Sequence, residues 1–480
     1  MRSAHRVETV RTAERTLMAQ LPDGALMQRA AAGLAAACAD ALPRRVYGSR
    51  VVLLTGSGDN GGDTLYAGSR LAKRGAGVTA VLLTPDRTHP EALKSLLRAG
   101  GTTATPQTAA DLIHHADLIL DGIVGIGGKG GLRPEAARLA ALVAASPATV
   151  IAVDLPSGIE PDTGEVHGAA VRADLTVTFG THKPGLLIDP AREYAGSVRL
   201  IDIGLASTLP ATPALESLQH ADVAALLPHP SQESDKYRRG VVGIAAGSTR
   251  YPGAAVLAVA GALRGGAGAV RYVGAATDAV LARFPETLVS NTGPKKAGRV
   301  QAWVAGPGAG DDPAPVAEAL STDVPVLLDA DGLRLADRET VRTRPAPTLM
   351  TPHAGEAAAL LGISREEVEA SRLTAAHDLA RAYDATVLLK GATTLIAAPD
   401  PDTPVRVNAT GTPWLATAGS GDVLSGLAGS LLAAGLSPLD AASVAAYVHG
   451  LAGRYAANGA PTGAHDVAKA IPAAWRDITA

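Results

Sequence analysis

The chain has 480 residues, more than a single hydrophobic core usually serves, so two domains are expected. Hydrophobic residues make up 47% of it and aromatic residues 3%, and this supply of small aliphatic side chains suits helices packed on buried parallel strands. The net charge of −3 without a basic tract argues against a nucleic-acid partner, and the single cysteine, Cys38, excludes an intramolecular disulfide framework and a cysteine-rich zinc site.

The N-terminal segment, residues 1–40, has apolar residues at helical spacing and no apolar core like that of a signal peptide. The longest weakly polar stretch, Val423–Leu439, is shorter than a bilayer span and contains Pro438, so it predicts a buried helix rather than a membrane helix. Together with the lone cysteine, these features predict a cytoplasmic protein without a membrane partner.

From Val51 onward, apolar strands alternate with helices. The pattern predicts a strand at Val51–Thr55, a loop at Gly56–Gly62 and a helix at Thr64–Arg74. Further strands are predicted at Val78–Thr84, Leu118–Gly122, Thr149–Leu155, Leu175–Phe179 and Val198–Ile203. This alternation predicts a doubly wound parallel sheet, in which ligands bind beyond the carboxyl ends of the strands.

Residues 205–220 mix Pro, Ser and Thr without a clear strand, so we place the domain boundary there, with domains at 1–215 and 216–480. A second series of strands follows, at Val241–Ala246, Ala269–Val273, Ala302–Ala305, Val326–Asp329, Thr348–Met350 and Thr386–Leu389. Two long alanine-rich helices, starting near Gly421 and Pro438, are expected to close it. The predicted fold class is α/β, with two three-layer α/β domains.

In the first half, a glycine-rich segment, GSGDNGGD at Gly56–Asp63, lies between a predicted strand and a predicted helix. Glycines at such a turn allow backbone N–H groups to approach a phosphate at the positive end of the helix. The segment matches neither the dinucleotide fingerprint nor a Walker loop, and a tight turn without a ligand remains an alternative.

Two later strand ends carry Asp121 and Asp154. Either aspartate alone could be a helix cap. However, Asn60, Asp121 and Ser157 together offer hard oxygen ligands without His or Cys, and such a set favours a hard cation over zinc.

The order DNGGD, DGIVGIGGKGGLR and DLPSG resembles the NAD(P)H-hydrate epimerase domain (the YjeF N-terminal family) over nearly all of residues 1–210. The resemblance implies that Asn60, Asp121 and Ser157 bind a potassium ion, and Asp121 is our candidate for proton transfer. It also implies a larger set of residues that hold the hydrated nicotinamide nucleotide: Asp59, Asn60, Gly61, Gly62, Asp63, Gly125, Ile126, Gly127, Gly128, Lys129, Gly130, Gly131 and Asp154.

The first half departs from that family at a few positions. The family usually has Asn at Asp59, Gly at Thr64, and GTG at Ile126–Gly128. The side chain of Thr64 is a candidate for crowding the phosphate contact, and Asp59 places a carboxylate near an anionic ligand.

In the second half, GSGD lies at the start of a predicted helix within Ala416–Gly426. Its backbone N–H groups would form an anion hole for a transferred phosphoryl group, with Asp422 as a base toward a substrate hydroxyl or, alternatively, as a helix cap. Other predicted strand ends carry GPGAG, DADG, TPHAGE and KGATT, and together they indicate one nucleotide cleft. His353, taken alone, is better explained as an ordinary hydrogen-bonded histidine.

These segments, preceded by YPGAA at Tyr251–Ala255, resemble the ADP-dependent NAD(P)H-hydrate dehydratases (YjeF C-terminal, ribokinase-like fold) over almost all of residues 220–480. The departures are mild, with Ala354 and Ser420 where Pro and Thr are common, and Gly332 where Ala is usual. The resemblance implies two sets of contacts. The hydrate would contact Ala254, Gly310, His353 and Asp422, and the adenine nucleotide would contact Lys390, Gly391, Ala392, Thr393, Thr394 and Gly421.

Taken together, the two resemblances imply a bifunctional enzyme that repairs the hydrates of NADH and NADPH (NADHX and NADPHX). One half would interconvert their R and S forms, and the other would use ADP and Mg²⁺ to dehydrate the S form, releasing AMP and phosphate. The expected partners are these small molecules and further copies of the chain. The alternative is a vitamin-precursor kinase, which shares the GxGD anion hole, fused to a non-catalytic binding module. The first half would have no role in the pathway of such a kinase, and this counts against the alternative.

Overall fold

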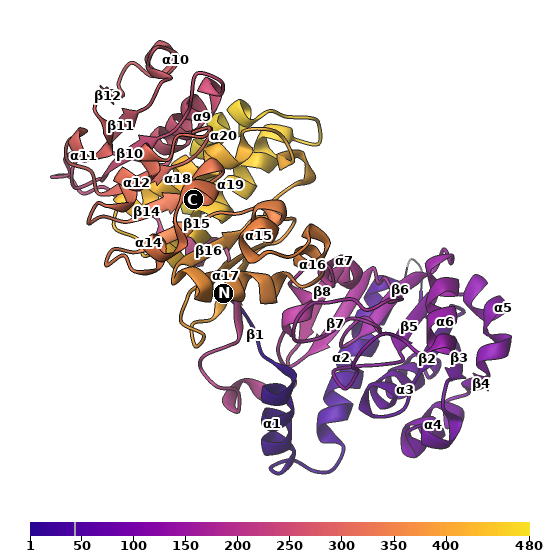
Figure 1. Cartoon of the computed structure of the whole chain (residues 1–480). Coiled ribbons are helices and arrows are strands. Elements are labelled where there is room, and N and C mark those ends of the chain that lie inside the picture. Colours follow the sequence, from indigo (N-terminus) through magenta and orange to yellow (C-terminus); the bar gives the residue numbers. More distant parts are fainter. Residues whose placement is uncertain (43–44) are drawn as a thin grey trace. The chain divides into compact units, whose positions relative to one another are not determined.

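The computed structural model describes residues 1–42 and 45–480, and these form two compact units (Figure 1). The N-terminal unit is Ser3–Ala214. The C-terminal unit is Leu215–Ala480 together with Met1–Arg2. Each unit has its own sheet and its own hydrophobic core, and each is described separately below.

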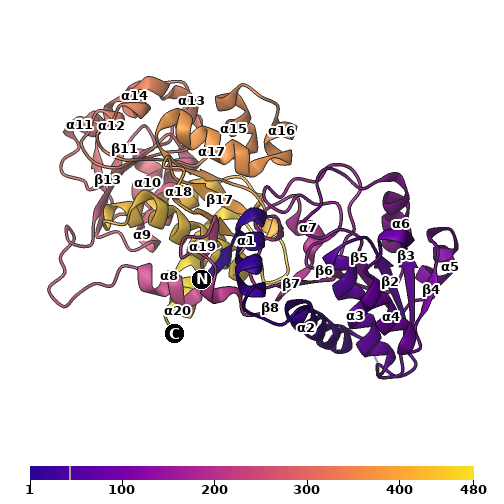
Figure 2. The ribbon, with the colours of Figure 1, turned by 90° about the horizontal axis from the view of Figure 1, so that it is seen from below.

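The described part of the N-terminal unit contains a seven-stranded sheet in the order β4-β3-β2-β5-β6-β7-β8. All neighbouring strands are parallel, which confirms the predicted doubly wound sheet (Figure 2). The strands are β2 (Arg50–Thr55), β3 (Gly77–Leu82), β4 (Thr102–Ala104), β5 (Leu118–Gly122), β6 (Thr149–Val153), β7 (Leu175–Phe179) and β8 (Ser197–Ile201). The chain order reverses between β2 and β5, so the loops after these two strands open into one crevice.

Helices cover both faces of this sheet because β2 is apolar on both sides. Leu53 packs in a core with residues of α2 (Ala25–Ala41) and α3 (Asp59–Ala72). Its neighbour Leu54 points the other way and packs with residues of α5 (Ala109–His114) and α6 (Pro134–Ala144). The remaining helices are α1 (Val7–Met18), α4 (Pro90–Arg98) and the short α7 (Arg192–Ala195).

Several strand bounds differ from their predictions by one or two residues, β4 was not predicted, and the glycine-rich loop differs more consequentially. The loop predicted at Gly56–Gly62 is shorter, because α3 already begins at Asp59. The turn needs only three residues, since Gly58 adopts a φ of 97° that favours glycine. A Cβ atom at Gly61 would lie 2.3 Å from the carbonyl oxygen of Gly56, so glycine is needed where the first turn of the helix folds back on the strand end.

The described part of the C-terminal unit contains an eleven-stranded sheet in the order β1-β9-β18-β17-β16-β15-β14-β13-β10-β11-β12, in which the edge strand β1 is Arg2–Ala4. Its parallel part confirms the predicted series and consists of β10 (Val241–Ala245), β11 (Ala269–Val273), β12 (Leu288–Ser290), β13 (Ala302–Ala305), β14 (Val326–Leu328), β15 (Thr348–Met350) and β16 (Thr386–Leu389). Beyond it, β17 (Thr394–Ala397) runs antiparallel to both β16 and β18 (Val405–Asn408).

Four long helices pack against one another beside this sheet: α9 (Pro252–Arg264), α18 (Ser420–Ala433), α19 (Pro438–Ala457) and α20 (Ala464–Thr479) (Figure 1). Shorter helices follow individual strands: α8 (His220–Leu226), α10 (Thr277–Arg283), α11 (Gly293–Lys296), α12 (Ala314–Leu320), α13 (Asp331–Leu335), α14 (Arg338–Arg342), α15 (Ala354–Leu361), α16 (Arg365–Ala370) and α17 (Arg372–Tyr383). Among the described residues, no helix combines the length and the hydropathy that crossing a membrane requires.

Two predictions for this unit were wrong. The segment 205–220, predicted without a strand, contains β9 (Leu215–Ser217), which pairs with β18 across the sheet and is too short to give a sequence pattern. The unit ends in a long helix, α20, that comes after the two predicted closing helices. Its internal Pro472 is a residue that usually marks the end of a helix, so the sequence did not indicate it. Packing of Ile471 and Ala474 into the core offsets the hydrogen bond that the proline removes.

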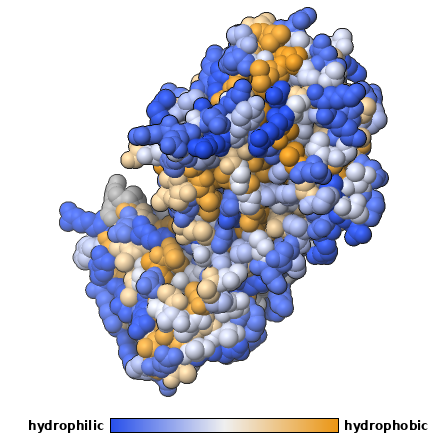
Figure 3. Space-filling view, turned by 90° about the vertical axis from the view of Figure 1, so that its left-hand side faces the viewer, coloured by the Kyte–Doolittle hydropathy of each residue, from blue (hydrophilic) through white to orange (hydrophobic). Residues whose placement is uncertain are grey.

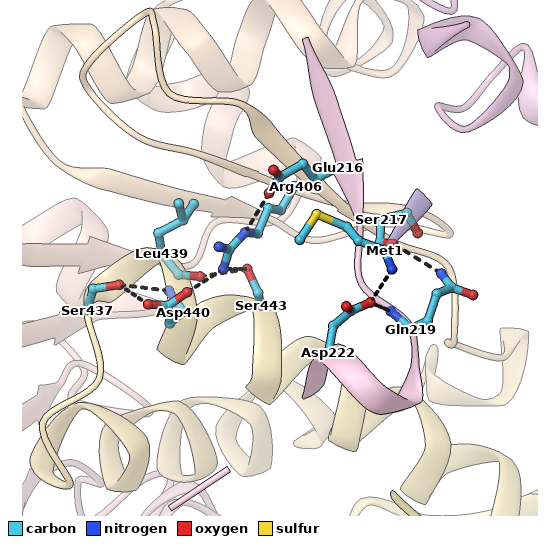
Figure 4. Close-up of polar contacts among 10 residues, drawn as sticks. All are labelled: Met1, Glu216, Ser217, Gln219, Asp222, Arg406, Ser437, Leu439, Asp440 and Ser443. Carbon is cyan, nitrogen blue, oxygen red and sulfur yellow. Dashed lines mark hydrogen bonds and ion pairs between the residues drawn. The ribbon is translucent and has the colours of Figure 1, made fainter. Parts of the chain in front are cut away.

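Polar contacts fix the edge of the C-terminal sheet near β9 (Figure 4). The ammonium group of Met1 lies 2.7 Å from Asp222, and the Arg406 guanidinium bridges Asp440, at 2.5 Å, and Glu216, at 3.4 Å. Burial alone would raise the pKa of Asp222, but the hydrogen bonds from the Met1 ammonium and the Gln219 N–H outweigh it and lower that pKa.

Hydrophilic side chains cover much of the molecular face in Figure 3, with hydrophobic ones in scattered groups.

Candidate active sites

In the N-terminal unit, Asp121 lies near the carboxyl end of β5 and is fully buried. Three donors reach its carboxylate: the Ser157 N–H to Oδ2 (2.7 Å), and the Ser157 hydroxyl (2.6 Å) and the Ile123 N–H (3.3 Å) to Oδ1. Burial raises the pKa of Asp121 to about 6, although the hydrogen bonds from Ser157 and Ile123 oppose the shift. The structure therefore brings two of the three predicted cation ligands into direct contact.

The third predicted ligand, Asn60, lies in the first turn of α3. Its side-chain Nδ2 is buried and has no hydrogen-bond partner within the described residues. A Cβ atom at Gly125 would lie 3.0 Å from Asn60 Oδ1, so glycine is needed where the loop after β5 passes over this amide. The oxygens of Asn60, Asp121 and Ser157 therefore follow three neighbouring strands, and such a set of hard oxygens suits a cation.

Thr64, the candidate for crowding the phosphate contact, lies beneath the glycine-rich turn rather than exposed beside it. The residue is fully buried, and its hydroxyl donates a 2.7 Å hydrogen bond to the Asn60 carbonyl. Its side chain faces β5, where a Cβ atom at Gly122 would lie 2.0 Å from Thr64 Oγ1. Thr64 therefore fills space under the glycine-rich turn, while Asp59 is exposed at the start of α3.

The other predicted epimerase residues lie around the same strand ends. Lys129 is exposed in the 125–131 loop, and the Gly130 N–H donates to Glu160. Asp154 follows β6, is buried and has a positive φ of 66°. It forms an ion pair with Lys183, which the sequence analysis did not select although it follows β7 in the run THKPG.

In the C-terminal unit, Asp422 lies in the first turn of α18, after Gly419 with its φ of 85°. Burial and the neighbouring carboxylates of Asp329, Asp331 and Glu356 raise the pKa of Asp422 to about 7, against the opposing effect of Lys390. A carboxyl group with this pKa can accept a proton near neutral pH.

Lys390 follows β16 and lies close enough to Asp422 for its charge to act on that carboxyl group. Its Nζ lies 2.8 Å from Asp329 Oδ1 and 3.7 Å from Glu356. The Ser425 hydroxyl donates to the other oxygen of Asp329 at 2.7 Å, so one carboxylate ties β16, β14 and α18 together. A Cβ atom at Gly421 would lie 3.5 Å from Lys390 Nζ, and two of the predicted nucleotide-binding positions are therefore adjacent.

A cavity of about 460 Å³ opens beside this group and is lined by Asp331, Arg334, His353 and Glu356 together with apolar residues. His353 also caps α15, because its ring accepts from the Glu356 N–H while Glu356 accepts from the His353 N–H. The histidine thus fulfils the ordinary structural role and still faces the cavity.

The other predicted hydrate contacts lie next to this cavity. The Gly310 N–H donates a 2.9 Å hydrogen bond to Asp331. A Cβ atom at Gly308 would lie 2.7 Å from the Cβ of Ala254, so the GPGAG and YPGAA segments touch.

The predicted nucleotide loop Lys390–Thr394 is held from inside by a residue that the sequence analysis missed. Arg372, at the start of α17, is buried, and its guanidinium donates to the carbonyls of Leu389, Lys390 and Thr393. Within the loop, Gly391 and Ala392 are exposed while Thr393 is buried. A buried arginine aimed at main-chain carbonyls leaves no motif, because its partners are defined by the fold.

Arg372→Met is expected to raise the KM for ADP by about tenfold with a smaller effect on kcat, since loss of charged hydrogen bonds costs about 1–3 kcal/mol and the loop would no longer be preorganised. Dehydration rates at varied ADP concentration would measure this. Arg381→Met, an exposed change on the same helix, is the matched control. An unchanged KM in folded Arg372→Met would contradict the role.

Comparison with known proteins identifies the family. The family described as NAD(P)H-hydrate dehydratase matches residues 242–473, and the YjeF-related N-terminus matches residues 23–185. The bifunctional NAD(P)H-hydrate repair enzyme Nnr of Mycobacterium leprae is 50% identical over 457 residues, which cover 94% of this chain and 93% of that protein. The chain belongs to the bifunctional NAD(P)H-hydrate repair enzymes.

Other relatives agree with this family of repair enzymes. The Nnr protein of Mycobacterium tuberculosis H37Rv is 50% identical over 451 residues, covering 92% of both chains. A Bacillus subtilis ADP/ATP-dependent NAD(P)H-hydrate dehydratase, co-crystallised with ATP/Mg²⁺, matches 55% of this repair enzyme and 99% of its own chain, with 28% identity and a TM-score of 0.51. A ribokinase-like protein from Enterococcus faecalis, 21% identical with a TM-score of 0.50, covers 55% of this chain and 96% of its own and supports the ribokinase-like fold. The alternative of a vitamin-precursor kinase is not favoured.

Proposed function

We propose that the C-terminal unit of this repair enzyme dehydrates the S form of NADHX and NADPHX with ADP, and that the N-terminal unit interconverts the R and S forms. The observation that carries the first assignment is the position of Asp422 in the first turn of α18, behind the glycine turn at Gly419 and near the Lys390–Asp329 ion pair. Burial and neighbouring carboxylates raise its pKa to about 7, against the effect of Lys390. The match of the YjeF-related N-terminus to residues 23–185 supports the second.

In the proposed dehydratase reaction, Asp422 accepts the proton of the ring hydroxyl as that oxygen attacks the terminal phosphorus of ADP. The bond from this phosphorus to the bridging oxygen breaks, and AMP is released. The carbon–oxygen bond to the phosphorylated oxygen then breaks and phosphate departs, a far better leaving group than hydroxide. The adjacent ring carbon loses a proton to solvent, and the electron pair of that C–H bond restores the double bond of the ring. Backbone N–H groups at the start of α18 stabilise the transferred phosphoryl group.

Mg²⁺ and K⁺ are proposed for the two units on the basis of their oxygen ligands. Asp331 and Glu356 line the cavity and would hold Mg²⁺, which would neutralise charge on the transferred phosphoryl group. In the N-terminal unit, the side-chain oxygens of Asn60, Asp121 and Ser157 would hold K⁺, which would offset the charge of the buried Asp121 and fix the loop after β5. Asp121 remains our candidate for proton transfer in the epimerisation. Assembly into a homo-oligomer and a cytoplasmic location stay predictions.

A mixture of R and S hydrates with ADP and Mg²⁺ tests both activities in one reaction. We expect complete conversion to NADH or NADPH, with one AMP formed for each hydrate consumed. Chromatography that separates the two epimers would measure the consumption of each. If the S form is consumed while the R form falls only as fast as it does without enzyme, the epimerase assignment is wrong. If neither form is consumed, the dehydratase assignment is wrong.

A further inference from the structure

Lys183 is among the most deeply buried charged residues described in the N-terminal unit, with 1% of its surface exposed. It follows β7, and its ammonium group donates to a carboxylate oxygen of Asp154, to the Thr178 hydroxyl at 3.0 Å and to the Phe179 carbonyl at 3.1 Å. Burial of an ammonium group costs several kcal/mol unless its hydrogens are all bonded. All three donors of Lys183 are satisfied here, so the fold fixes this charge in one place.

Asp154, the partner of Lys183, is held from one side. Its Oδ1 accepts from Lys183, from the Thr178 hydroxyl at 2.9 Å and from the Phe179 N–H at 3.2 Å. Among the described residues, every hydrogen bond that the structure gives this carboxylate reaches Oδ1, and Oδ2 is left to accept from a ligand. The φ of 66° at Asp154 is costly for a residue other than glycine, and such strain is typical of residues that are held for a function.

Two other carboxyl groups, the buried Asp63 and the half-buried Glu14, face the same charges. Burial, Asp154 and Asp59 raise the pKa of Asp63, from α3, well above its usual range, and burial also raises the pKa of Glu14, from α1. Asp63 is 8% exposed, and its Oδ1 has no hydrogen-bond partner within the described ranges 1–42 and 45–480. The oxygens left without a partner in the described part of the chain, Oδ2 of Asp154 and Oδ1 of Asp63, suit hydroxyl or amide hydrogens of a ligand.

We propose that Lys183 is a positioning residue of the epimerase site, holding Asp154 by Oδ1 so that Oδ2 accepts a hydrogen bond from the hydrated ring of the substrate. This inference rests on the proposed epimerase function of the N-terminal unit. Lys183 itself is covered by Asp154 and Thr178 and acts through the carboxylate. The hydroxyl and carboxamide of the ring supply the donors that this end of the site lacks.

Lys183→Met, which keeps the length of the side chain and removes its charge, is expected to lower kcat for conversion of R to S hydrate by about 100-fold, with a smaller change in KM, because the carboxylate would no longer be held in its productive geometry. Asp154→Asn should cost at least as much. Adding Lys183→Met to Asp154→Asn should then have little further effect, since the lysine acts through the aspartate. Dehydration of pure S hydrate by the same molecules should be unchanged.

Lys94→Met, an exposed lysine of the same unit, is the matched control and should keep the wild-type rate. Thr178→Val removes only the hydroxyl that joins Lys183 to Asp154, and it serves as the test if Lys183→Met does not fold. We expect this variant to lose about tenfold in kcat. A wild-type kcat in folded Lys183→Met or in Thr178→Val would overturn the inference. The inference would also fail if Lys183→Met lowered kcat by the same factor in the wild-type and in the Asp154→Asn background. Absence of epimerisation in the wild-type protein would instead overturn the proposed function of the unit.

Discussion

Asp422→Asn is expected to lower the rate of ADP-dependent dehydration by about 10²- to 10⁴-fold, the usual contribution of a general base, while R and S hydrates continue to interconvert at the wild-type rate. The amide has nearly the shape of the carboxylate, so the start of α18 should keep its structure. It cannot accept the hydroxyl proton. Release of AMP and formation of NADH from S hydrate, measured in parallel, would give the loss, and Asp466→Asn, at an exposed position of α20, is the matched control.

The pH dependence of dehydration provides a second readout of the same residue. Burial and nearby carboxylates raise the pKa of Asp422 to about 7, and the reaction needs its ionised form. The rate should therefore rise about tenfold for each pH unit below 7 and level off above it. In Asp422→Asn, this acid limb should be absent. An unchanged acid limb, or AMP formation at the wild-type rate in the variant, would assign the base to another group.

The parts of the site that the sequence predicts are those set by local backbone chemistry. The strands at Leu118–Gly122 and Thr386–Leu389 were predicted with their observed bounds, because both are buried on both faces and read as continuous apolar runs. The glycine-rich turn before α18 was predictable for a similar reason, since a positive φ at its N-cap demands glycine.

What the sequence could not show are contacts between distant residues that carry no motif. Lys390 and Asp329 are 61 positions apart, and Ser425 and Asp329 are 96 apart, yet one carboxylate joins all three. The orientation of Thr64 could not be predicted either, because α3 begins at Asp59 rather than at Thr64, and the Thr64 side chain packs toward β5. Side-chain direction follows from element boundaries, and those are the least certain part of a prediction.

Asp121→Asn is expected to abolish epimerisation, with a loss of at least about 100-fold, and to leave dehydration of S hydrate intact. Both oxygens of the carboxylate accept hydrogen bonds, from Ser157 and Ile123. An amide has one oxygen, so its NH₂ group would face a donor of Ser157 or the Ile123 N–H, at a cost of about 1–3 kcal/mol. The variant also loses the anionic ligand of the proposed K⁺ site.

Potassium separates a ligand role for Asp121 from a purely structural one. In the wild-type protein, K⁺ should raise the melting temperature of the N-terminal unit relative to choline, because an ion that binds only the folded state stabilises it. Asp121→Asn should lose that K⁺-dependent shift as well as some stability, whereas Asp86→Asn, an exposed change in the same unit, should keep both. If Asp121→Asn lowers the melting temperature but retains the full response to K⁺, then Asp121 supports the turn at Ser157 without binding the ion. The cation would then have to be held by other oxygens around Asn60.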